Sequence, residues 1–200
     1  MKIHNFNSGP AILPPIVIEN TQKALVNFND SNLSILEIGH RTDKFKQVIN
    51  EAQQLVKKIM EIDDNYEVLF LTGGATTQFM QIPLNILDEN ETAGYVVNGI
   101  WGKKAAEEAS LFGQIELISN TADKNHTYIE TDLKIPTNIK YIHITTNNTV
   151  EGTQWHNFPT FNIPVVADMS SDIFSKKIQF NNFDLIYAGA QKNLGAAGVT

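Results

Sequence analysis

Short apolar segments alternate with longer amphipathic segments along most of this 200-residue chain. Tyr141–Thr145 is rich in β-branched and aromatic residues, as buried strands are, whereas apolar residues recur with a helical period between Phe45 and Met60. Alternation of this kind predicts an α/β fold with a mostly parallel central sheet flanked by helices. The expected strands span residues 66–71, 92–97, 114–118, 141–145, 163–168 and 185–188, and the expected helices span 14–26, 42–60, 75–86 and 100–112.

The composition favours one globular domain over residues 1–200, because 42% hydrophobic and 18% charged residues are ordinary values for such a domain. The formal net charge is −7 and there is no basic stripe, so nucleic acid is not an expected partner. Neither a membrane-spanning apolar run nor an apolar signal segment is present, so we expect no membrane partner and a cytoplasmic location. The absence of cysteine excludes disulfides and thiolate chemistry, and the histidines lack metal-ligand spacing, so we expect no metal.

A lysine and an aspartate each follow an apolar, strand-like segment. Lys192 comes shortly after Asp184–Ala188, among small residues, and Asp168 ends Ile163–Ala167. A lysine is rarely placed at the end of a buried strand for packing, because its charge is costly to remove from water. A covalent bond from the lysine to pyridoxal phosphate (PLP) removes that charge, and an aspartate facing the pyridine nitrogen completes the electron sink. Taken singly, the residues could be a loop lysine and a helix cap; together they favour a PLP site with Lys192 and Asp168 as catalytic residues.

The turn Gly73-Gly74, between a strand and a helix, is typical of a phosphate site. Glycines let the backbone approach an anion, and a helix N-terminus offers free N–H groups and the positive end of its dipole. We therefore expect the N–H groups of Ala75 and Thr76 to bind the cofactor phosphate, with the side-chain amide of Gln191. The turn is not a P-loop, because no Gly-Lys-Ser/Thr follows, and alone it could be an ordinary tight turn.

Other residues extend the candidate site. Trp101, at a strand–helix junction, could stack on a flat cofactor ring, although a tryptophan there is more often a core anchor. The Thr149 hydroxyl, in a polar loop, could reach the phenolic oxygen of the cofactor or orient the aspartate. Arg41 carries a guanidinium suited to a carboxylate or a phosphate, yet a lone arginine at a helix start is more often solvated. His40 is adjacent to it, and Ser8 begins a Ser-Gly-Pro motif.

Several sequence blocks, in one order over nearly the whole chain, resemble the phosphoserine aminotransferase family of class-V, fold-type-I PLP enzymes. The most specific block is Tyr187–Asn193, which reads Tyr-Ala-Gly-Ala-Gln-Lys-Asn. The other blocks are Phe6–Ala11, Gly39–Arg41, Val68–Gly74, Gln78–Phe79, Pro83–Leu87, Asn148–Gly152 and Ala167–Ser171. The resemblance implies the large PLP-binding domain of an aminotransferase that works as a homodimer, with its sites at the subunit interface.

The resemblance also implies roles for the candidate residues. Lys192 is implied to be the Schiff-base lysine, and Asp168 the partner of the pyridinium nitrogen. The other residues implied to bind the cofactor are Trp101, Thr149, Ala75, Thr76 and Gln191. The residues expected to bind the substrate are Arg41, His40 and Ser8.

The implied reaction is the reversible transfer of an amino group from L-glutamate to 3-phosphohydroxypyruvate. It gives O-phospho-L-serine and 2-oxoglutarate in serine biosynthesis, and in some bacteria it also serves pyridoxine biosynthesis. Many family members carry an arginine where Thr76 stands, and that arginine helps to bind the substrate phosphate. Members also extend past the lysine into a small C-terminal domain that this chain does not include. Because Gly195–Thr200 resembles a turn entering another strand, we expect a longer native product.

Two alternatives stay open. Another small-molecule PLP enzyme, such as a serine–pyruvate aminotransferase or a cysteine desulfurase, would share Asp168 and Lys192 but would need no site for a substrate phosphate. A non-catalytic module could use the same fold for ligand sensing or assembly, although it would have no need of a lysine after the strand. The absorbance band of bound PLP would distinguish an enzyme from such a module.

Overall fold

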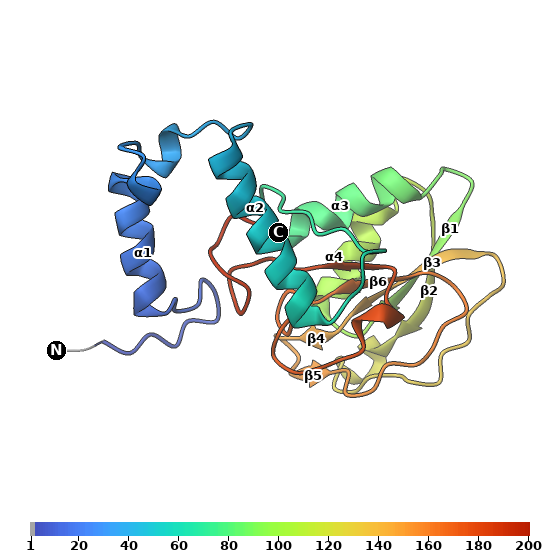
Figure 1. The fold of residues 1–200 in the computed structure, drawn as a ribbon. Helices are drawn as coiled ribbons and strands as arrows, with labels where there is room; N and C mark the ends of the chain where they lie inside the picture. The colour runs from blue at the N-terminus through green and yellow to red at the C-terminus, as the bar shows by residue number, and fades with distance from the viewer. Residues whose placement is uncertain (1–2) are drawn as a thin grey trace. The chain divides into compact units, whose positions relative to one another are not determined.

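The computed structural model describes residues 3–200, which belong to two compact units. The first unit extends to Phe70, and the second runs from Leu71 to Thr200. Figure 1 shows the helices and strands of both units, coloured along the chain. None of the helices between residues 3 and 200 combines the length and the apolar character that crossing a lipid bilayer requires.

The first unit is helical, and its two longer helices confirm the helices expected there. α1 (Pro15–Val26) begins with a proline in its first turn, where the missing N–H removes no helical hydrogen bond. α2 (Asp43–Met60) begins after Thr42, whose hydroxyl accepts a hydrogen bond of 3.4 Å from the Phe45 N–H. The 3-10 helices between them are η1 (Phe28–Asp30) and η2 (Ile35–Glu37).

The strand expected over residues 66–71 is wrong. Only its end is paired: Leu71 and Thr200 exchange backbone hydrogen bonds of 2.8 and 2.9 Å, and the Gly73 N–H donates to the Gly198 carbonyl at 3.0 Å. This short antiparallel ladder belongs to the second unit. An apolar segment becomes a strand only where its backbone groups meet those of a neighbour, and no strand of the described chain pairs with residues 66–70.

The second unit is built on a five-stranded sheet in the order β2-β1-β3-β6-β7, and all of its strand pairs are parallel. Its strands are β1 (Thr92–Val97), β2 (Gln114–Asn120), β3 (Ile139–Thr145), β6 (Val165–Asp168) and β7 (Leu185–Tyr187). The other elements are α3 (Ala75–Ile86), α4 (Ile100–Ala109), the antiparallel pair β4 (Asn147–Asn148) and β5 (Thr153–Gln154), and the 3-10 helices η3 (Thr121–Lys124) and η4 (Phe180–Asn182). The strands expected after residue 90 are all present, and the helix expected over residues 100–112 ends earlier, at Ala109.

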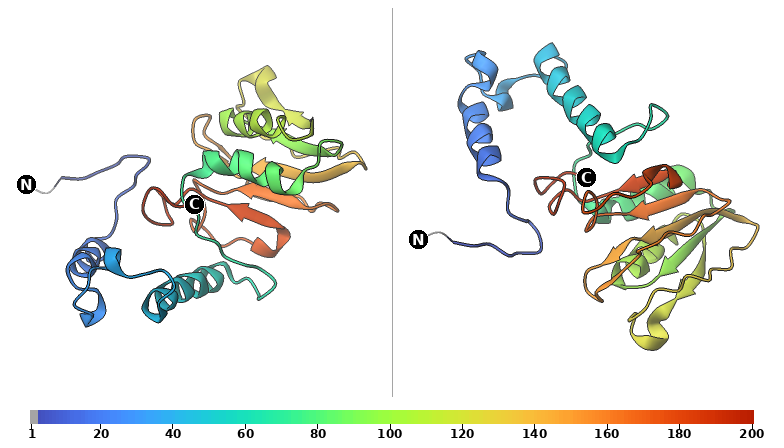
Figure 2. Two further views of the ribbon diagram at one scale, coloured as in Figure 1. Left: turned by 90° about the horizontal axis from the view of Figure 1, so that it is seen from above. Right: turned by 60° about the horizontal axis from the view of Figure 1, so that its bottom comes forward.

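Helices α3 and α4 pack side by side on one face of the sheet (Figures 1 and 2). Their inward residues and alternate residues of the strands form a continuous core. Its members include Phe79, Ile82, Tyr95, Val97, Ala105, Ala109, Tyr141, Val166 and Tyr187. The strand residues between them point to the other face, where Val96, Ile142 and Ile144 are also buried. Burial on both faces explains why these strands are almost continuously apolar in sequence.

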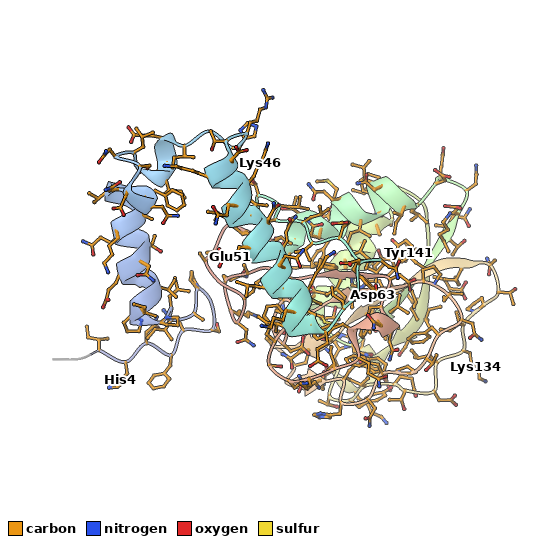
Figure 3. The ribbon with its side chains drawn as sticks, viewed as in Figure 1. His4, Lys46, Glu51, Asp63, Lys134 and Tyr141 are labelled. Atoms are coloured by element: carbon orange, nitrogen blue, oxygen red, sulfur yellow. The ribbon has the colours of Figure 1, made fainter. Side chains whose placement is uncertain are left out.

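Polar side chains are enclosed in this core. The hydroxyls of Tyr95 and Tyr141, the latter labelled in Figure 3, lie 2.9 Å apart. The His143 ring stacks on Tyr95 with 4.8 Å between the ring centroids, and its Nε2 lies 2.8 Å from the Tyr187 hydroxyl. Burial lowers the pKa of His143 to about 3, so the ring is neutral near pH 7. It also raises the pKa of Tyr141 to about 12.

The burial of His143 predicts that the fold loses stability as the pH falls. The unfolded chain binds a proton at this ring below about pH 6.5, whereas the folded chain keeps it neutral down to about pH 3. The contribution of His143 to the free energy of unfolding is therefore complete above about pH 6.5. As the pH falls towards 3, the free energy of unfolding decreases by up to about 1.4 kcal/mol per pH unit.

Urea unfolding of wild type and His143→Gln between about pH 7 and about pH 4 measures this effect. Glutamine does not titrate, so wild type should lose several kcal/mol more than the variant over that range. A difference between the two proteins that stays constant with pH would contradict the prediction.

Candidate active site

The carboxyl ends of β1, β3, β6 and β7 lie at one edge of the sheet because these strands are parallel. Thr145 of β3 is in register with Asp168 of β6, and Asp168 is in register with Tyr187 of β7. The chain then passes from Tyr187 into the segment that holds Lys192. The two residues expected to be catalytic thus follow neighbouring strands, at the edge where ligands bind in sheets of this type.

Asp168 is a buried carboxylate, only 5% exposed. Its Oδ1 accepts hydrogen bonds from the Ser170 N–H at 2.9 Å and from the Ser170 hydroxyl at 2.6 Å. Burial raises the pKa of Asp168, and the charge of Asp172 adds to this, while the hydrogen bonds from Ser170 and Tyr187 lower it. No basic side chain of residues 3–200 forms an ion pair with Asp168. A protonated pyridine nitrogen brought by a ligand would therefore meet an unneutralised charge.

Lys192 lies in a tight turn that is hydrogen-bonded to the surroundings of this carboxylate. The Gly189 N–H donates at 3.1 Å to the Ser170 hydroxyl, the same hydroxyl that binds the carboxylate. The Gly195 N–H donates to the Ala190 carbonyl at 2.7 Å and closes the turn around Lys192. The Lys192 side chain is half-buried and has no hydrogen-bond or ion-pair partner within residues 3–200. Its amine is therefore available for a covalent bond.

The N-terminus of α3 and the side chain of Gln191 meet beside Gly189. A Cβ atom at Gly189 would lie 2.7 Å from Gln191 Oε1 and would displace that side chain, and it would touch the Ala75 nitrogen at 3.4 Å. Gly74 caps α3 without a side chain, which leaves the first N–H groups of the helix, including those of Ala75 and Thr76, for an anion. The structure thus brings these groups to one place, and their role as phosphate ligands stays a prediction.

Trp101 lies in the first turn of α4, next to the turn between β4 and β5. Its indole N–H donates to the Thr149 hydroxyl at 3.4 Å, and the Lys104 ammonium lies 5.0 Å from the centroid of its ring. Trp101 packs against the core but is only half-buried, whereas Thr149 is exposed. Trp101 is therefore partly a core anchor, and the rest of its surface remains for a flat ligand.

Glu151 is a residue of this site that the sequence analysis missed. Its Oε1 accepts a hydrogen bond of 2.8 Å from the Ile100 N–H, so the carboxylate caps α4 from the turn between β4 and β5. A Cβ atom at Gly99 would lie 2.6 Å from the other carboxylate oxygen, so the loop can approach only a glycine. Glu151 thus fastens the loop that carries Thr149 to the helix that carries Trp101. The sequence gives one weak signal of this contact, namely the lack of a capping side chain just before α4.

The residues at this edge fit PLP. The cofactor consists of a phosphate, a flat aromatic ring, a ring nitrogen that can carry a proton, and an aldehyde. The edge offers helix N–H groups, an indole, a buried carboxylate and a free amine in matching roles. Buried polar atoms without a partner in the described chain lie at the same strand ends, on Asn98, Thr145 and Asn148. A polar ligand would satisfy such atoms.

The residues expected to bind the substrate belong to the first unit. Ser8, His40 and Arg41 are all exposed, and Arg41 directly precedes Thr42, the cap of α2. Their part in substrate binding stays a prediction. Within residues 3–200 no group of three or more side chains is arranged to hold a metal ion.

Comparison with known families agrees with this geometry. The family model described as aminotransferase class-V matches residues 3–200, and the chain therefore belongs to the class-V aminotransferases. Within that family it is similar to phosphoserine aminotransferases. The enzyme of that name from Flavobacterium johnsoniae is 50% identical over 201 residues, which cover 100% of this chain and 56% of the relative. The one from Lysinibacillus sphaericus is 50% identical over 202 residues with the same coverage, so the chain spans little more than half the length of these relatives.

Solved structures show the same relationship. The phosphoserine aminotransferase from Bacillus circulans subsp. alkalophilus matches with a TM-score of 0.93 and 42% identity, over 98% of this chain and 55% of its own. The PLP-bound phosphoserine aminotransferase from Trichomonas vaginalis matches with a TM-score of 0.90 and 29% identity, over 99% of this chain and 56% of its own. These matches confirm the expected α/β fold, and the C-terminal part of both solved chains lies outside the sequence described here.

Loss of the Glu151 cap should weaken both the fold and the site. Glu151→Ala leaves the Ile100 N–H without its acceptor, so the free energy of unfolding should fall by about 0.5–2 kcal/mol, the usual loss for a helix cap. Because the cap also fastens Trp101 to its loop, the affinity for PLP should fall too. Glu151→Gln keeps an acceptor oxygen and should lose less. Urea unfolding and absorbance titration with PLP measure the two effects.

The control is Glu107→Ala on the exposed side of the same helix. Glu107 forms only a 3.7 Å surface ion pair with Lys103, and such pairs contribute at most about 1 kcal/mol. The control should leave PLP affinity unchanged. Equal effects of Glu107→Ala and Glu151→Ala on both measurements would show that the cap does not hold the site.

Proposed function

We propose that the protein containing this chain is a phosphoserine aminotransferase with PLP as its cofactor. It transfers an amino group reversibly between L-glutamate and 3-phosphohydroxypyruvate, which gives O-phospho-L-serine and 2-oxoglutarate, in serine biosynthesis. One observation carries the proposal: Asp168, the Lys192 turn and Gly189 beside the start of α3 lie at one sheet edge, in a chain whose sequence is 50% identical to proteins of this name.

PLP, when bound, supplies an electron sink that lets the α-hydrogen of an amino acid leave as a proton. Lys192 provides the amine that attaches the cofactor. Once free of the cofactor, the same amine takes the α-proton as a base and returns a proton as an acid. Its lack of a competing ion pair within the described chain suits both tasks.

Asp168 holds a proton at the ring nitrogen, because a nearby negative charge favours the protonated form of that nitrogen. The two hydrogen bonds from Ser170 keep the carboxylate in one orientation. The phosphate of the cofactor is bound by the N–H groups of Ala75 and Thr76 at the start of α3 and by the side-chain amide of Gln191. The Trp101 indole and the Thr149 hydroxyl supply the remaining contacts.

The acidic groups of the substrate are bound by Arg41, with His40 and Ser8. Arg41 is the only arginine among the 200 residues, and a guanidinium can form paired hydrogen bonds with a carboxylate or a phosphate. Thr76 adds no positive charge at the start of α3. Within this chain, Arg41 is therefore the residue best suited to recognise the substrate phosphate.

The proposed enzyme is a cytoplasmic homodimer. Apolar side chains at the start of the chain support an interface there: Ile3, Phe6 and Ile12 are 84%, 92% and 66% exposed, and no residue of α1 is buried. Exposed apolar surface of this kind marks a place where another subunit or domain docks. Sedimentation equilibrium of the whole protein tests the dimer, and a monomer at micromolar concentration would contradict it.

Lys192 should be the residue that binds PLP covalently. Borohydride treatment of the whole protein, followed by peptide mapping, should place the cofactor on Lys192. Lys192→Ala should abolish turnover yet still bind some PLP, because the phosphate and ring contacts remain. Lys103→Ala, at an exposed position on α4, is the control and should keep the label and the activity. A label on any other lysine contradicts the assignment.

Arg41→Ala should depress the turnover of phosphoserine while the absorbance of bound PLP stays intact. Loss of a charge-assisted pair with a buried anion costs roughly 1.5–3 kcal/mol, or about ten- to a hundredfold in kcat/KM. Arg41→Lys keeps the positive charge but cannot form the paired hydrogen bonds of a guanidinium, so it should recover only part of the turnover of phosphoserine. Phosphoserine and serine are compared in wild type and both variants.

Two outcomes of this comparison are decisive. If wild type does not prefer phosphoserine to serine, the protein is an aminotransferase of another specificity. If the preference survives Arg41→Ala, the phosphate is recognised by other residues of the whole protein.

A further inference from the structure

Three polar side chains on neighbouring strands form a line of contacts inside the core. Nε2 of His143 in β3 lies 2.8 Å from the Tyr187 hydroxyl of β7. Tyr187 is in register with Asp168 of the adjacent strand β6, and its hydroxyl is electrostatically coupled to the Asp168 carboxyl. Because β6 lies between β3 and β7, the Tyr187 hydroxyl reaches across β6 to His143. The three residues are 2%, 6% and 5% exposed, in the order His143, Tyr187 and Asp168, so they interact away from bulk water.

This line of contacts is not explained by packing. A phenylalanine and a leucine in place of Tyr187 and His143 would fill similar space without removing polar atoms from water. The desolvation cost is plain at His143, whose Nδ1 is buried without a partner in the described part of the chain. An imidazole and a hydroxyl in this position therefore point to a task at the neighbouring carboxylate.

The charge of Asp168 sets the direction of the hydrogen bonds. A neutral His143 has one ring nitrogen that donates and one that accepts. When Asp168 is ionised, the Tyr187 hydroxyl donates to the carboxylate, and His143 must then donate from Nε2 to the Tyr187 oxygen. When position 168 is uncharged, Tyr187 can donate to Nε2 instead, and the His143 proton then sits on Nδ1.

We propose that Tyr187 and His143 are positioning residues that hold the Asp168 carboxylate in the orientation that receives the cofactor's ring nitrogen; this rests on the proposed function. Ser170 holds Oδ1 of the carboxylate from one loop, and Tyr187 holds the carboxyl from the adjacent strand. His143 fixes the Tyr187 hydroxyl and is itself held by stacking on Tyr95. The carboxylate is thus held by several groups that do not touch the substrate.

The same contacts tie the carboxylate to the lysine segment. Tyr187 directly precedes Ala188–Gln191, which leads into Lys192, and Ser170 accepts a hydrogen bond from Gly189 in that segment. A movement of β7 would therefore displace the carboxylate and the amine together. Their relative position, on which both proton-handling tasks depend, is set by Tyr187 and Ser170.

The tautomer of His143 tests the hydrogen-bond direction without any turnover. NMR of the whole protein with isotope-labelled histidine, with and without PLP, reports which ring nitrogen carries the proton, and His143→Gln identifies the signal by its loss. We expect the proton on Nε2 in wild type and a substantial shift towards Nδ1 in Asp168→Asn, where the fixing charge is gone. The same tautomer in both proteins overturns the proposal.

Tyr187→Phe tests the positioning itself. The variant keeps the ring in the core, so it should still fold, with an unfolding midpoint somewhat below wild type because His143 Nε2 and Asp168 each lose a partner. Its dissociation constant for PLP should rise about tenfold, and kcat should fall about tenfold with little change in KM. Tyr141→Phe is the matched control, because its hydroxyl bonds to Tyr95, outside this line of contacts, and its PLP affinity should stay the same. Equal PLP affinities of Tyr187→Phe and Tyr141→Phe overturn the proposal.

A second pair of variants gives the same test if Tyr187→Phe does not fold. His143→Ala removes the group that fixes Tyr187 and should weaken PLP binding severalfold, whereas His143→Gln can replace the Nε2–H with an amide N–H and should restore most of it. Equal binding by both variants overturns the proposal. Failure of wild type to bind PLP would refute the proposed function instead, and the tautomer in the unloaded protein would still decide whether the contacts act as described.

Discussion

The negative charge of Asp168 has to be held inside a parallel sheet, where a carboxylate loses its water and needs hydrogen-bond donors in exchange. Those donors come from two directions, Ser170 after β6 and Tyr187 on β7. The hydrogen bond to Asp168 also fixes the position of the segment that carries each donor. Ser170 also holds Gly189, and Gly189 lies against the start of α3. The need to stabilise one buried charge therefore links the strand ends, the lysine turn and the start of α3.

Much of this arrangement follows from local sequence patterns. The alternation of strands and helices predicts the parallel sheet, and parallel strands place all their carboxyl ends at one edge. Asp168 and Lys192 could be proposed as catalytic residues from the sequence because each is a charged residue at or after the end of an apolar strand, where packing gives no reason for a charge. Ala75 and Thr76 could be proposed as phosphate ligands because a glycine turn before a helix is a local signal; their role stays a prediction.

Contacts between distant segments could not be predicted in the same way. Glu151 caps a helix that begins 51 positions earlier, so no window of sequence contains both partners. His143 and Tyr187 read as ordinary strand residues until the strand order places them across β6 from each other. The segment 66–70 shows the opposite failure, because its local pattern is that of a strand but strand formation depends on a partner.

The ladder between Leu71–Gly73 and Gly198–Thr200 joins the two ends of the second unit. The ribosome synthesises the N-terminal residues first. Residues 71–73 therefore have no partner until almost the whole second unit has been synthesised. The pairing of β1 with β2 and β3 involves shorter chain separations and can form earlier. The start of α3, where the phosphate is expected, would then be among the last parts of the unit to take its final place. The backbone ladder that leads into α3 would therefore close only after residue 200 had been synthesised.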